Sequence, residues 1–333
     1  VYKRQPMRSL LVTEGCPDPE GSGLQRRAAQ HLRTLARLGP VDVVLPWRAQ
    51  ATPAAEVEET CRRLGADRVM RRDDPSLAER ARLAHAAARN PLTRAWRAVQ
   101  RPAPFDARAQ RAHVQRHRAA LAGRSYDLVF AFRITSAIWA ESVLPRQAWG
   151  KARVVDFDDI ESVTFQAEVE TGTHSRFWDW KLRRQLRWLT AAERRLLATW
   201  SAASVCSQLD ADRLEQRYGR RPWVAPNGYA FGPKCPPPAA DPFTLLFVGT
   251  FGHAPNVVGA RWFVSEALPR VREALGGRIQ VLLAGFDPPP EIRALGSLPG
   301  VVLVADAPSV SPLYAQAHAV IATLFSGSGT RIK

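Results

Sequence analysis

Short apolar runs alternate with amphipathic segments along the chain, and this alternation restricts the fold more than any other feature of the sequence. Near the start, residues 8–14 read as a strand, residues 24–38 show a helical pattern, and residues 41–45 form a second apolar run. A strand, a glycine-containing loop, a helix and a strand make the opening unit of a doubly wound parallel sheet. The sequence therefore predicts an α/β fold.

The loop between the first strand and the first helix contains Gly21, Ser22 and Gly23. These residues do not match the GxGxxG fingerprint of dinucleotide-binding proteins. Two interpretations stay open: the loop lines a ligand crevice at the end of the strand, or it is an ordinary connection into the helix.

The alternation restarts after a proline-rich stretch at residues 232–242, which predicts a stiff linker. Beyond it, strands are predicted over 244–251, 279–284, 301–306 and 319–325, with helices over 257–274 and 311–317. We therefore predict two Rossmann-like domains, one over residues 7–231 and one over 243–333. Residues 1–6 read as a polar leader before Met7 that is not native, and the second domain is expected to be incomplete.

Residues 53–124 are rich in Ala and Arg and predict helices with a break near Pro102 and Pro104. His113 and His117 have the i, i+4 spacing at which two imidazoles can share a metal. Because arginines flank both of them, we predict a solvated helix face instead, and no metal site.

The chain is strongly basic, with a formal net charge of +16 and a pI near 10.8. Residues 1–241 hold 40 basic and 26 acidic residues, or +14 of that charge. Such a charge invites a nucleic-acid or membrane partner, although arginine enrichment from a GC-rich genome explains it equally well. The four cysteines show no metal or CxxC spacing and no run of about 18 apolar residues exists. We expect reduced thiols and a cytoplasmic protein.

A bunch of acids follows the predicted strand at residues 153–157: Asp156, Asp158, Asp159 and Glu161. Ligands bind at the carboxyl ends of strands in open α/β sheets, so these acids are candidate catalytic residues. The alternative is helix capping, with Asp158 or Asp159 as the cap and Glu161 in the first turn. Each interpretation fits different members of the bunch.

Residues 177–200 predict a long helix with one apolar stripe and an otherwise basic surface. A basic amphipathic helix with Trp at its ends can lie on an anionic membrane. The stripe can also pack on the sheet, which leaves the arginines solvated.

The final stretch is the strongest candidate for an anion site: Gly327, Ser328, Gly329, Thr330, Arg331, Ile332 and Lys333. It follows an apolar run, and a helix is expected to begin there. Small residues expose backbone N–H groups, and Arg331 and Lys333 add full positive charges. An ordinary turn after a strand is the alternative.

Several motifs in their order along the chain resemble the family 4 glycosyltransferases of the GT-B fold, whose two Rossmann-like domains face a shared cleft. The resemblance covers essentially the whole chain and is densest over 242–333. Its motifs are residues 156–162, Val205-Cys206-Ser207, Pro226-Asn227-Gly228, Phe247-Val248-Gly249-Thr250, Pro255-Asn256, Arg261-Trp262-Phe263, Leu268-Pro269, Ala284-Gly285, Pro288-Pro289-Pro290-Glu291, Pro299-Gly300-Val301 and the final stretch.

The resemblance implies a retaining, metal-independent transfer of a sugar, of hexosyltransferase type, from a nucleotide-sugar to a glycan, a lipid-linked molecule or a small molecule. It implies a role in cell-envelope polysaccharide or glycoconjugate synthesis, with no cofactor beyond the nucleotide-sugar substrate. The catalytic acids would be Asp158, Asp159 and Glu161, and the loop Gly21-Ser22-Gly23 would lie on the acceptor side. The donor-binding residues would be Gly249, Thr250, Asn256, Gly285, Gly327, Ser328, Gly329, Thr330, Arg331 and Lys333.

Two departures from the family pattern stand out. Thr250 and Phe251 occupy positions where many relatives have a basic residue, and Asp158 precedes Asp159 where many relatives have His before Asp. Arg331 and Lys333 must then supply most of the phosphate charge.

The alternatives are a GT-B-like binding module without turnover and a basic nucleic-acid-binding protein, for which the sequence shows no recognition motif. We expect no nucleic-acid partner, and a peripheral position on the inner face of the membrane is an open expectation. Because the sequence stops at Lys333, we also expect a fragment that transfers sugar weakly or not at all.

Overall fold

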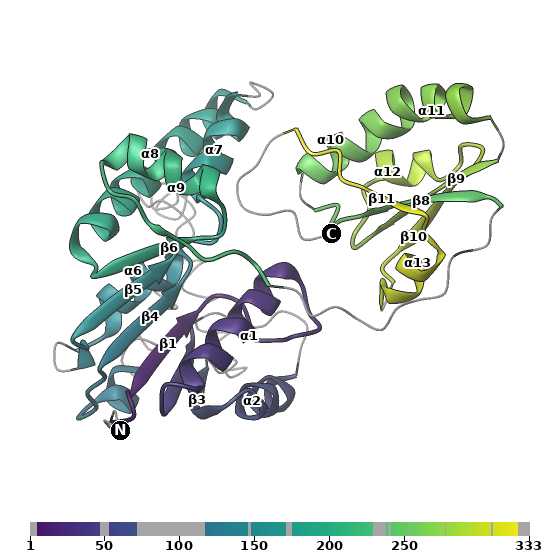
Figure 1. The fold of residues 1–333 in the computed structure, drawn as a ribbon. Coiled ribbons are helices and arrows are strands. Elements are labelled where there is room, and N and C mark those ends of the chain that lie inside the picture. Colours follow the sequence, from purple (N-terminus) through teal and green to yellow (C-terminus); the bar gives the residue numbers. More distant parts are fainter. Residues whose placement is uncertain are drawn as a thin grey trace, which may run out of the picture. The chain divides into compact units, whose positions relative to one another are not determined.

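The computed structural model describes residues 5–46, 53–71, 117–145, 148–170, 175–228, 238, 241–252, 254–276, 278–307 and 309–325 (Figure 1). They form two compact units: unit 1 comprises those up to Gly228, and unit 2 those from Pro238 onwards. Most of the predicted linker lies outside the described residues. The domain boundaries and the cleft between the domains therefore stay predictions.

Unit 1 is built on a seven-stranded parallel sheet with the order β3-β2-β1-β4-β5-β6-β7. Its strands are β1 (Ser9–Thr13), β2 (Val41–Leu45), β3 (Ala66–Arg71), β4 (Leu128–Phe132), β5 (Ala152–Asp156), β6 (Ala202–Val205) and β7 (Trp223–Val224). Its described helices are α1 (Gly23–Ala36), α2 (Ala54–Arg63), α6 (Ile134–Val143), α7 (Glu161–Glu170), α8 (Arg176–Thr199) and α9 (Gln208–Tyr218). The order reverses between β1 and β4, which makes this pair the topological switch point of the sheet.

Hydrophobic side chains cover both faces of this sheet. Leu10 and Val12 of β1 pack with buried residues of α6, α8 and α9, whereas Leu11 packs on the opposite face with residues of α1 and α2. Successive strand residues point to opposite faces, so a continuous aliphatic run is what a sheet buried on both sides requires. Each such side chain stabilises the fold by about 1.5–3 kcal/mol.

Unit 2 contains a four-stranded parallel sheet with the order β10-β9-β8-β11. Its strands are β8 (Phe243–Val248), β9 (Ile279–Gly285), β10 (Val301–Ala305) and β11 (Ala319–Ile321). The helices are α10 (Ala254–Trp262), α11 (Leu268–Leu275), α12 (Pro290–Leu295) and α13 (Ser311–Gln316), with a π-helical turn at Phe263–Ala267. Two parallel sheets with interleaved helices confirm the predicted α/β class.

Three predictions of local structure were wrong. Residues 53–124 were expected to be helical, but Ala66–Arg71 form the edge strand β3, in which Ala66 and Met70 are buried between exposed charged residues. An edge strand needs only a few buried apolar side chains. In a segment rich in charged residues, such widely spaced apolar positions do not stand out as a strand pattern. The predicted helix over 257–274 is confirmed, because α10, the π-helical turn and α11 follow one another without a break.

The other two errors concern the last strand and one histidine. The predicted buried strand over 319–325 is only the three residues of β11, which lies at the edge of the described sheet, pairs there with β8 and is largely exposed. His117 was expected on a solvated face, but it is buried and lies edge-on to the Trp139 ring. His113 lies outside the described residues.

Helix α8 divides into two parts. From Leu182 onwards its apolar stripe is buried, with Leu189 and Leu196 in the core of unit 1. The residues of the first turn that precede Leu182 are exposed, including Trp178 at 51%. The packing interpretation therefore holds for most of the helix. Among the described residues, no helix combines the length and apolarity needed to cross a membrane.

Candidate active site

Charged side chains gather at the carboxyl ends of β1, β4 and β5, which are neighbours in the sheet of unit 1. Glu14 follows β1, Arg133 follows β4, and Asp156 ends β5 and is followed by Asp158 and Glu161. All strands are parallel, so these ends meet along one edge of the sheet. This edge includes the switch point, where open α/β sheets bind ligands.

Asp156 holds helix α1 against the sheet. Its fully buried carboxylate accepts hydrogen bonds from Arg27 Nε at 2.8 Å and Arg27 Nη2 at 3.0 Å, and it contacts His31 Nε2. Burial acts to raise the pKa of Asp156, but the hydrogen bonds and charges of His31 and Arg27 outweigh it and lower the pKa to about 2. Asp156 is therefore an ionised structural carboxylate, not a proton carrier.

Arg27 extends this connection to the last strand of unit 1. Its Nη1 donates hydrogen bonds to the Ala225 carbonyl oxygen at 2.8 Å and to Asn227 Oδ1 at 2.9 Å. Its pairing with Asp156 was not predicted from the sequence. The only signal was a charged residue on the face of α1 that otherwise carries buried residues such as Ala28 and Leu32.

Among the acids at this edge, Asp158 has the most strongly shifted pKa. Its backbone has a φ of +57°, a left-handed conformation that few residue types other than Gly, Asn and Asp adopt. Its side chain is 11% exposed, and Oδ1 lies 3.4 Å from Arg27 Nε. Burial, followed by the charge of Asp159, raises the pKa of Asp158 to about 7. A carboxyl group of that pKa can accept or release a proton near neutral pH.

Glu161 forms a second pair at the same edge. Its Oε1 lies 3.2 Å from Arg133 Nη2, and Arg133 Nε lies 3.7 Å from Glu14 Oε2. Burial raises the pKa of Glu161 to about 7, although the Arg133 charge acts to lower it. Glu161 also opens α7, so its predicted place in the first helical turn is confirmed.

Arg133 was missed by the sequence analysis. It has a φ of +74°, and its buried Nε makes no hydrogen bond to any part of the chain that the structure describes. Its ion-pair partner Glu14 Oε2, at 3.7 Å, lies beyond hydrogen-bond distance, so Nε has donor capacity for a ligand. Its place directly after an apolar strand was the one sequence signal available.

The loop Gly21-Ser22-Gly23 serves as the entry to α1. Ser22 is the N-cap residue, and its backbone N–H donates to Gln25 Oε1 at 2.9 Å. Ordinary loop chemistry thus accounts for the contacts of this loop, and its acceptor-side role stays a prediction.

The donor-side residues within the described part of unit 2 also come together. A Cβ atom on Gly285 would lie 1.9 Å from the Gly249 carbonyl oxygen, so the ends of β9 and β8 touch at a point that only glycine permits. Asn256 Nδ2 donates to the Thr250 carbonyl oxygen at 2.8 Å and holds the loop after β8. The final stretch, residues 327–333, lies outside the described residues.

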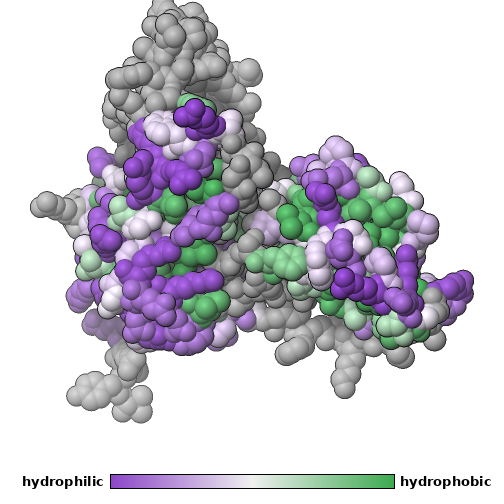
Figure 2. Space-filling view, turned by 90° about the horizontal axis from the view of Figure 1, so that it is seen from above, coloured by the Kyte–Doolittle hydropathy of each residue, from purple (hydrophilic) through white to green (hydrophobic). Residues whose placement is uncertain are grey.

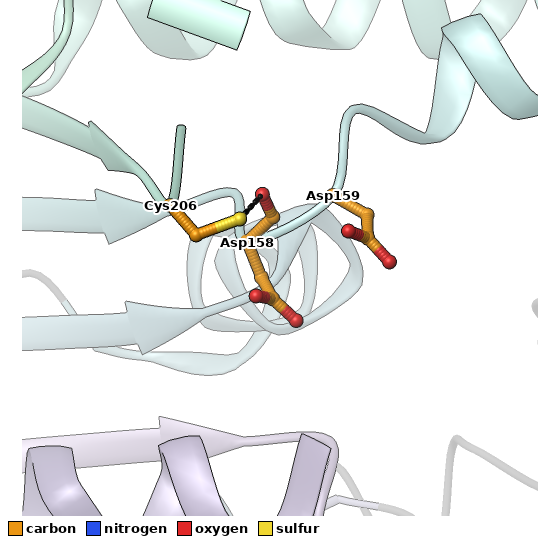
Figure 3. Close-up of side chains that lie close together, drawn as sticks. All are labelled: Asp158, Asp159 and Cys206. Carbon is orange, nitrogen blue, oxygen red and sulfur yellow. Dashed lines mark hydrogen bonds between the residues drawn. The ribbon is translucent and has the colours of Figure 1, made fainter. Parts of the chain in front are cut away.

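One group of side chains in the described residues has metal-ligating geometry. Asp158, Asp159 and Cys206 offer ligand atoms within 4.8 Å of one another. In Figure 3 the Cys206 thiol donates to the Asp158 main-chain oxygen, at 3.2 Å, while the two carboxylates point away from it. A cation would also compete with the Arg27 guanidinium for Asp158. The geometry therefore fits acid–base or hydrogen-bonding roles better than a metal centre.

Comparison with known proteins gives a family match for unit 2 and structural matches over nearly the whole chain. Residues 242–333 match the family model of glycosyl transferases group 1. The chain resembles a sucrose-phosphate synthase from Thermosynechococcus elongatus, with a TM-score of 0.60 and 13% identity over 98% of this chain and 77% of that one. No curated protein matches the chain.

Two other solved structures resemble the chain. TarM has a TM-score of 0.57 and 7% identity over 99% of this chain and 82% of its own. The lipopolysaccharide outer core galactosyltransferase WaaB, in its apo form, has a TM-score of 0.51 and 13% identity over 96% and 74%. At these identities the likeness shows the fold alone.

Proposed function

We propose that the chain is a group 1 glycosyltransferase (family 4), the family whose model residues 242–333 match, and that it moves a hexose from a nucleotide-sugar to an acceptor hydroxyl with retention of configuration. In this reaction the acceptor oxygen bonds to the anomeric carbon of the donor. The bond from that carbon to the phosphate oxygen breaks, and the acceptor proton leaves with the nucleoside diphosphate or through a protein carboxylate. The enzyme must therefore stabilise a developing diphosphate charge and orient the acceptor.

Unit 2 is the proposed donor side. At Gly249 and Gly285 an added Cβ would meet the Asn256 side chain and the Phe251 ring, so these glycines let the ends of β8 and β9 pack closely. We propose that this close packing shapes the edge at which the nucleotide binds. By resemblance, Arg331 and Lys333 with the N–H groups of residues 327–330 neutralise the diphosphate. These groups suffice for the charge, so we propose that no metal is required.

Unit 1 is the proposed acceptor side, and one observation carries this assignment: the Asp158 carboxyl group is buried, has a pKa near 7 and lies on a left-handed backbone. Such an environment is expensive in a group without a function. Asp158, with Asp159 and Glu161, would accept hydrogen bonds from acceptor hydroxyls, and Arg133 Nε would donate one. These groups suit a polyhydroxylated acceptor, either a glycan or the sugar of a lipid-linked molecule.

We place the reaction in the cytoplasm, in cell-envelope polysaccharide or glycoconjugate synthesis. Among the described residues, Cys16, Cys61 and Cys206 form no disulfide, and reduced thiols are typical of a reducing compartment. Burial raises the pKa of Cys61 to about 12, so this thiol is inert and belongs to the core.

The donor assignment is tested by thermal-shift screening of the full chain against a panel of nucleotide-hexoses, followed by binding measurements with the best one. Arg331→Ala or Lys333→Ala should weaken donor binding about ten- to a hundredfold, because a charge-assisted hydrogen bond contributes roughly 1.5–3 kcal/mol. Arg278→Ala is the matched control, since Arg278 is an exposed arginine of unit 2 that pairs only with Asp241 among the described residues. Unchanged donor affinity in both loop variants would refute the assignment.

Transfer itself separates an enzyme from a binding module of the same fold. With the best donor and a set of glycan and lipid-linked acceptors, glycosylated product identified by mass spectrometry would support the proposal. Donor binding without product or hydrolysis under any condition would favour the binding module.

A further inference from the structure

The start of α8 exposes three large aromatic side chains within one turn. Phe177 is 56% exposed, Trp178 51% and Trp180 40%. Burial of apolar surface is the main driving force for folding. Three adjacent aromatic side chains exposed to water are therefore costly unless a partner covers them. We call these three residues, together with Lys181 and Arg184, the α8 tip.

The aromatic rings of the α8 tip are interleaved with positive charges. The Lys181 ammonium lies 4.4 Å from the Trp178 ring centroid, and the Arg184 guanidinium lies 5.6 Å from that of Trp180. The rings of Phe177 and Trp180 stack at 6.2 Å. Residues three and four apart lie on one side of a helix, so Phe177, Trp180 and Arg184 share one side. Trp178 and Lys181 form a second ring–cation pair on a different side of the same turns.

The α8 tip lies outside the core of unit 1. Leu182 and Leu189 on the same helix are buried, whereas Phe177, Trp180 and Arg184 follow a spacing that places them on another side. The face of unit 1 seen in Figure 2 is largely hydrophilic, with long polar side chains around smaller apolar areas. Trp178 therefore continues the core stripe one turn before Leu182, whereas Phe177 and Trp180 lie outside that stripe.

The positive charge at the start of α8 favours a negatively charged partner. Residues 176–187 contain five basic residues and one acid, Asp179, for a net charge of +4, and the two acids at the end of α7 reduce it only to +2. Asp179 itself pairs with Arg183 at 2.8 Å. A surface of Trp, Phe, Lys and Arg complements the interface of an anionic bilayer, where rings enter the headgroup layer and cations meet lipid phosphates.

We propose that the α8 tip docks unit 1 on an anionic lipid surface without crossing it. The helix carries too many charges to enter the hydrocarbon core. If the acceptor is lipid-linked, as the proposed function allows, such docking would hold unit 1 at the surface on which that acceptor resides.

The test is flotation of the full chain with phosphatidylcholine vesicles and with vesicles that also contain phosphatidylglycerol. The chain should float with the anionic vesicles, and added salt should reduce the bound fraction. Lys181→Gln with Arg184→Gln should weaken partitioning about thirtyfold, from roughly one tenfold step per 1.4 kcal/mol and about 1 kcal/mol per charge. Phe177→Ala with Trp178→Ala and Trp180→Ala should weaken it about a hundredfold or more.

Matched controls come from the same unit. Trp223 is 77% exposed on β7, and Trp223→Ala should leave flotation unchanged. Arg33→Gln with Arg37→Gln removes two exposed charges from α1 and should cost less than threefold. Circular dichroism and thermal unfolding check that each variant is folded, and the charge variant keeps the test valid if the aromatic variant is not.

Three results would overturn the proposal. The first is equal binding to neutral and anionic vesicles, or none to either. The second is anionic binding that survives both variants of the α8 tip. The third is a dimer, detected by light scattering, that depends on the aromatic residues and persists while flotation is absent, because the occupant would then be a second copy of the chain.

Discussion

The substitution Asp158→Asn should stabilise the protein above neutral pH while it impairs transfer. Asn keeps the size of the side chain and tolerates the left-handed backbone at φ +57°, so the change removes mainly the charge. In the folded protein that charge is opposed by burial and by Asp159, which raise the pKa of Asp158 from 3.8 to about 7.

The magnitude follows from the shift in the pKa. A change of 1 in a pKa corresponds to 1.36 kcal/mol. The pKa of Asp158 rises by roughly 3, so ionised Asp158 costs up to about 4 kcal/mol of folding free energy. The cost is absent below about pH 4, where both states hold the proton, grows between about pH 4 and 7, and is complete above that range. The variant should therefore gain stability over the natural protein across this window.

The assay is guanidinium unfolding at about pH 4 and about pH 8, with the transition of each unit fitted separately because two units need not unfold together. Asp156→Asn is the matched control, since its carboxylate lies two residues away and has the opposite environment. The pKa of Asp156 is lowered to about 2, so its charge contributes stability above about pH 4 that is lost as the pH falls towards 2. Its removal should destabilise unit 1 by at least about 2 kcal/mol at neutral pH.

The reasoning is refuted if Asp158→Asn is no more stable than the natural protein at about pH 8, or if its gain is the same at both pH values. A pH-independent gain would show that the preference of Asn for the left-handed conformation, and not the lost charge, explains the effect. In the expected case the transfer rate falls at least tenfold in the same variant, since a positioned proton acceptor contributes roughly a hundredfold or more.

Two further substitutions test the packing around each site. Arg27→Ala should destabilise unit 1 by about 3–5 kcal/mol in denaturant unfolding, because it leaves the Asp156 carboxylate buried without its bidentate partner; a loss below about 1 kcal/mol would contradict that role. Gly285→Ala should unfold unit 2 at a lower temperature and weaken nucleotide binding, since the new Cβ would lie 1.9 Å from the Gly249 carbonyl oxygen. Gly252→Ala is the control, as a Cβ there meets nothing within 4 Å, and equal effects in both variants would argue against the close contact.

The sequence allowed the parallel sheets and the edge that carries the site to be predicted, because both depend on local patterns. Aliphatic runs such as those of β1 and β4 are distinctive when a strand is buried on both faces. The acids after β5 could be placed at the edge because the carboxyl ends of parallel strands always meet. Where the pattern was diluted by charge, as in β3, the prediction failed.

Partnerships over long distances in the chain could not be predicted. Arg27 and Asp156 are 129 residues apart, and nothing in either local segment indicates that the two charges are buried together. The same holds for His117, whose arginine-rich neighbourhood indicated a solvated face although the fold buries it against Trp139. The place of Glu161 in the first turn of α7 was local and was predicted, but its pairing with Arg133 depends on the neighbouring strand.

The position of β1 in the interior of the seven-stranded sheet, next to β4, has a consequence during synthesis. β1 pairs with β2 on one side, but its other neighbour is β4, and the hydrogen bond from Arg8 to Asp127 joins residues 119 positions apart. At about 5–20 residues per second, the ribosome needs roughly 6 to 24 seconds to supply that partner. During this interval an apolar strand edge lacks its pair, so slow translation or crowding of nascent chains would favour aggregation of unit 1 before its fold can close.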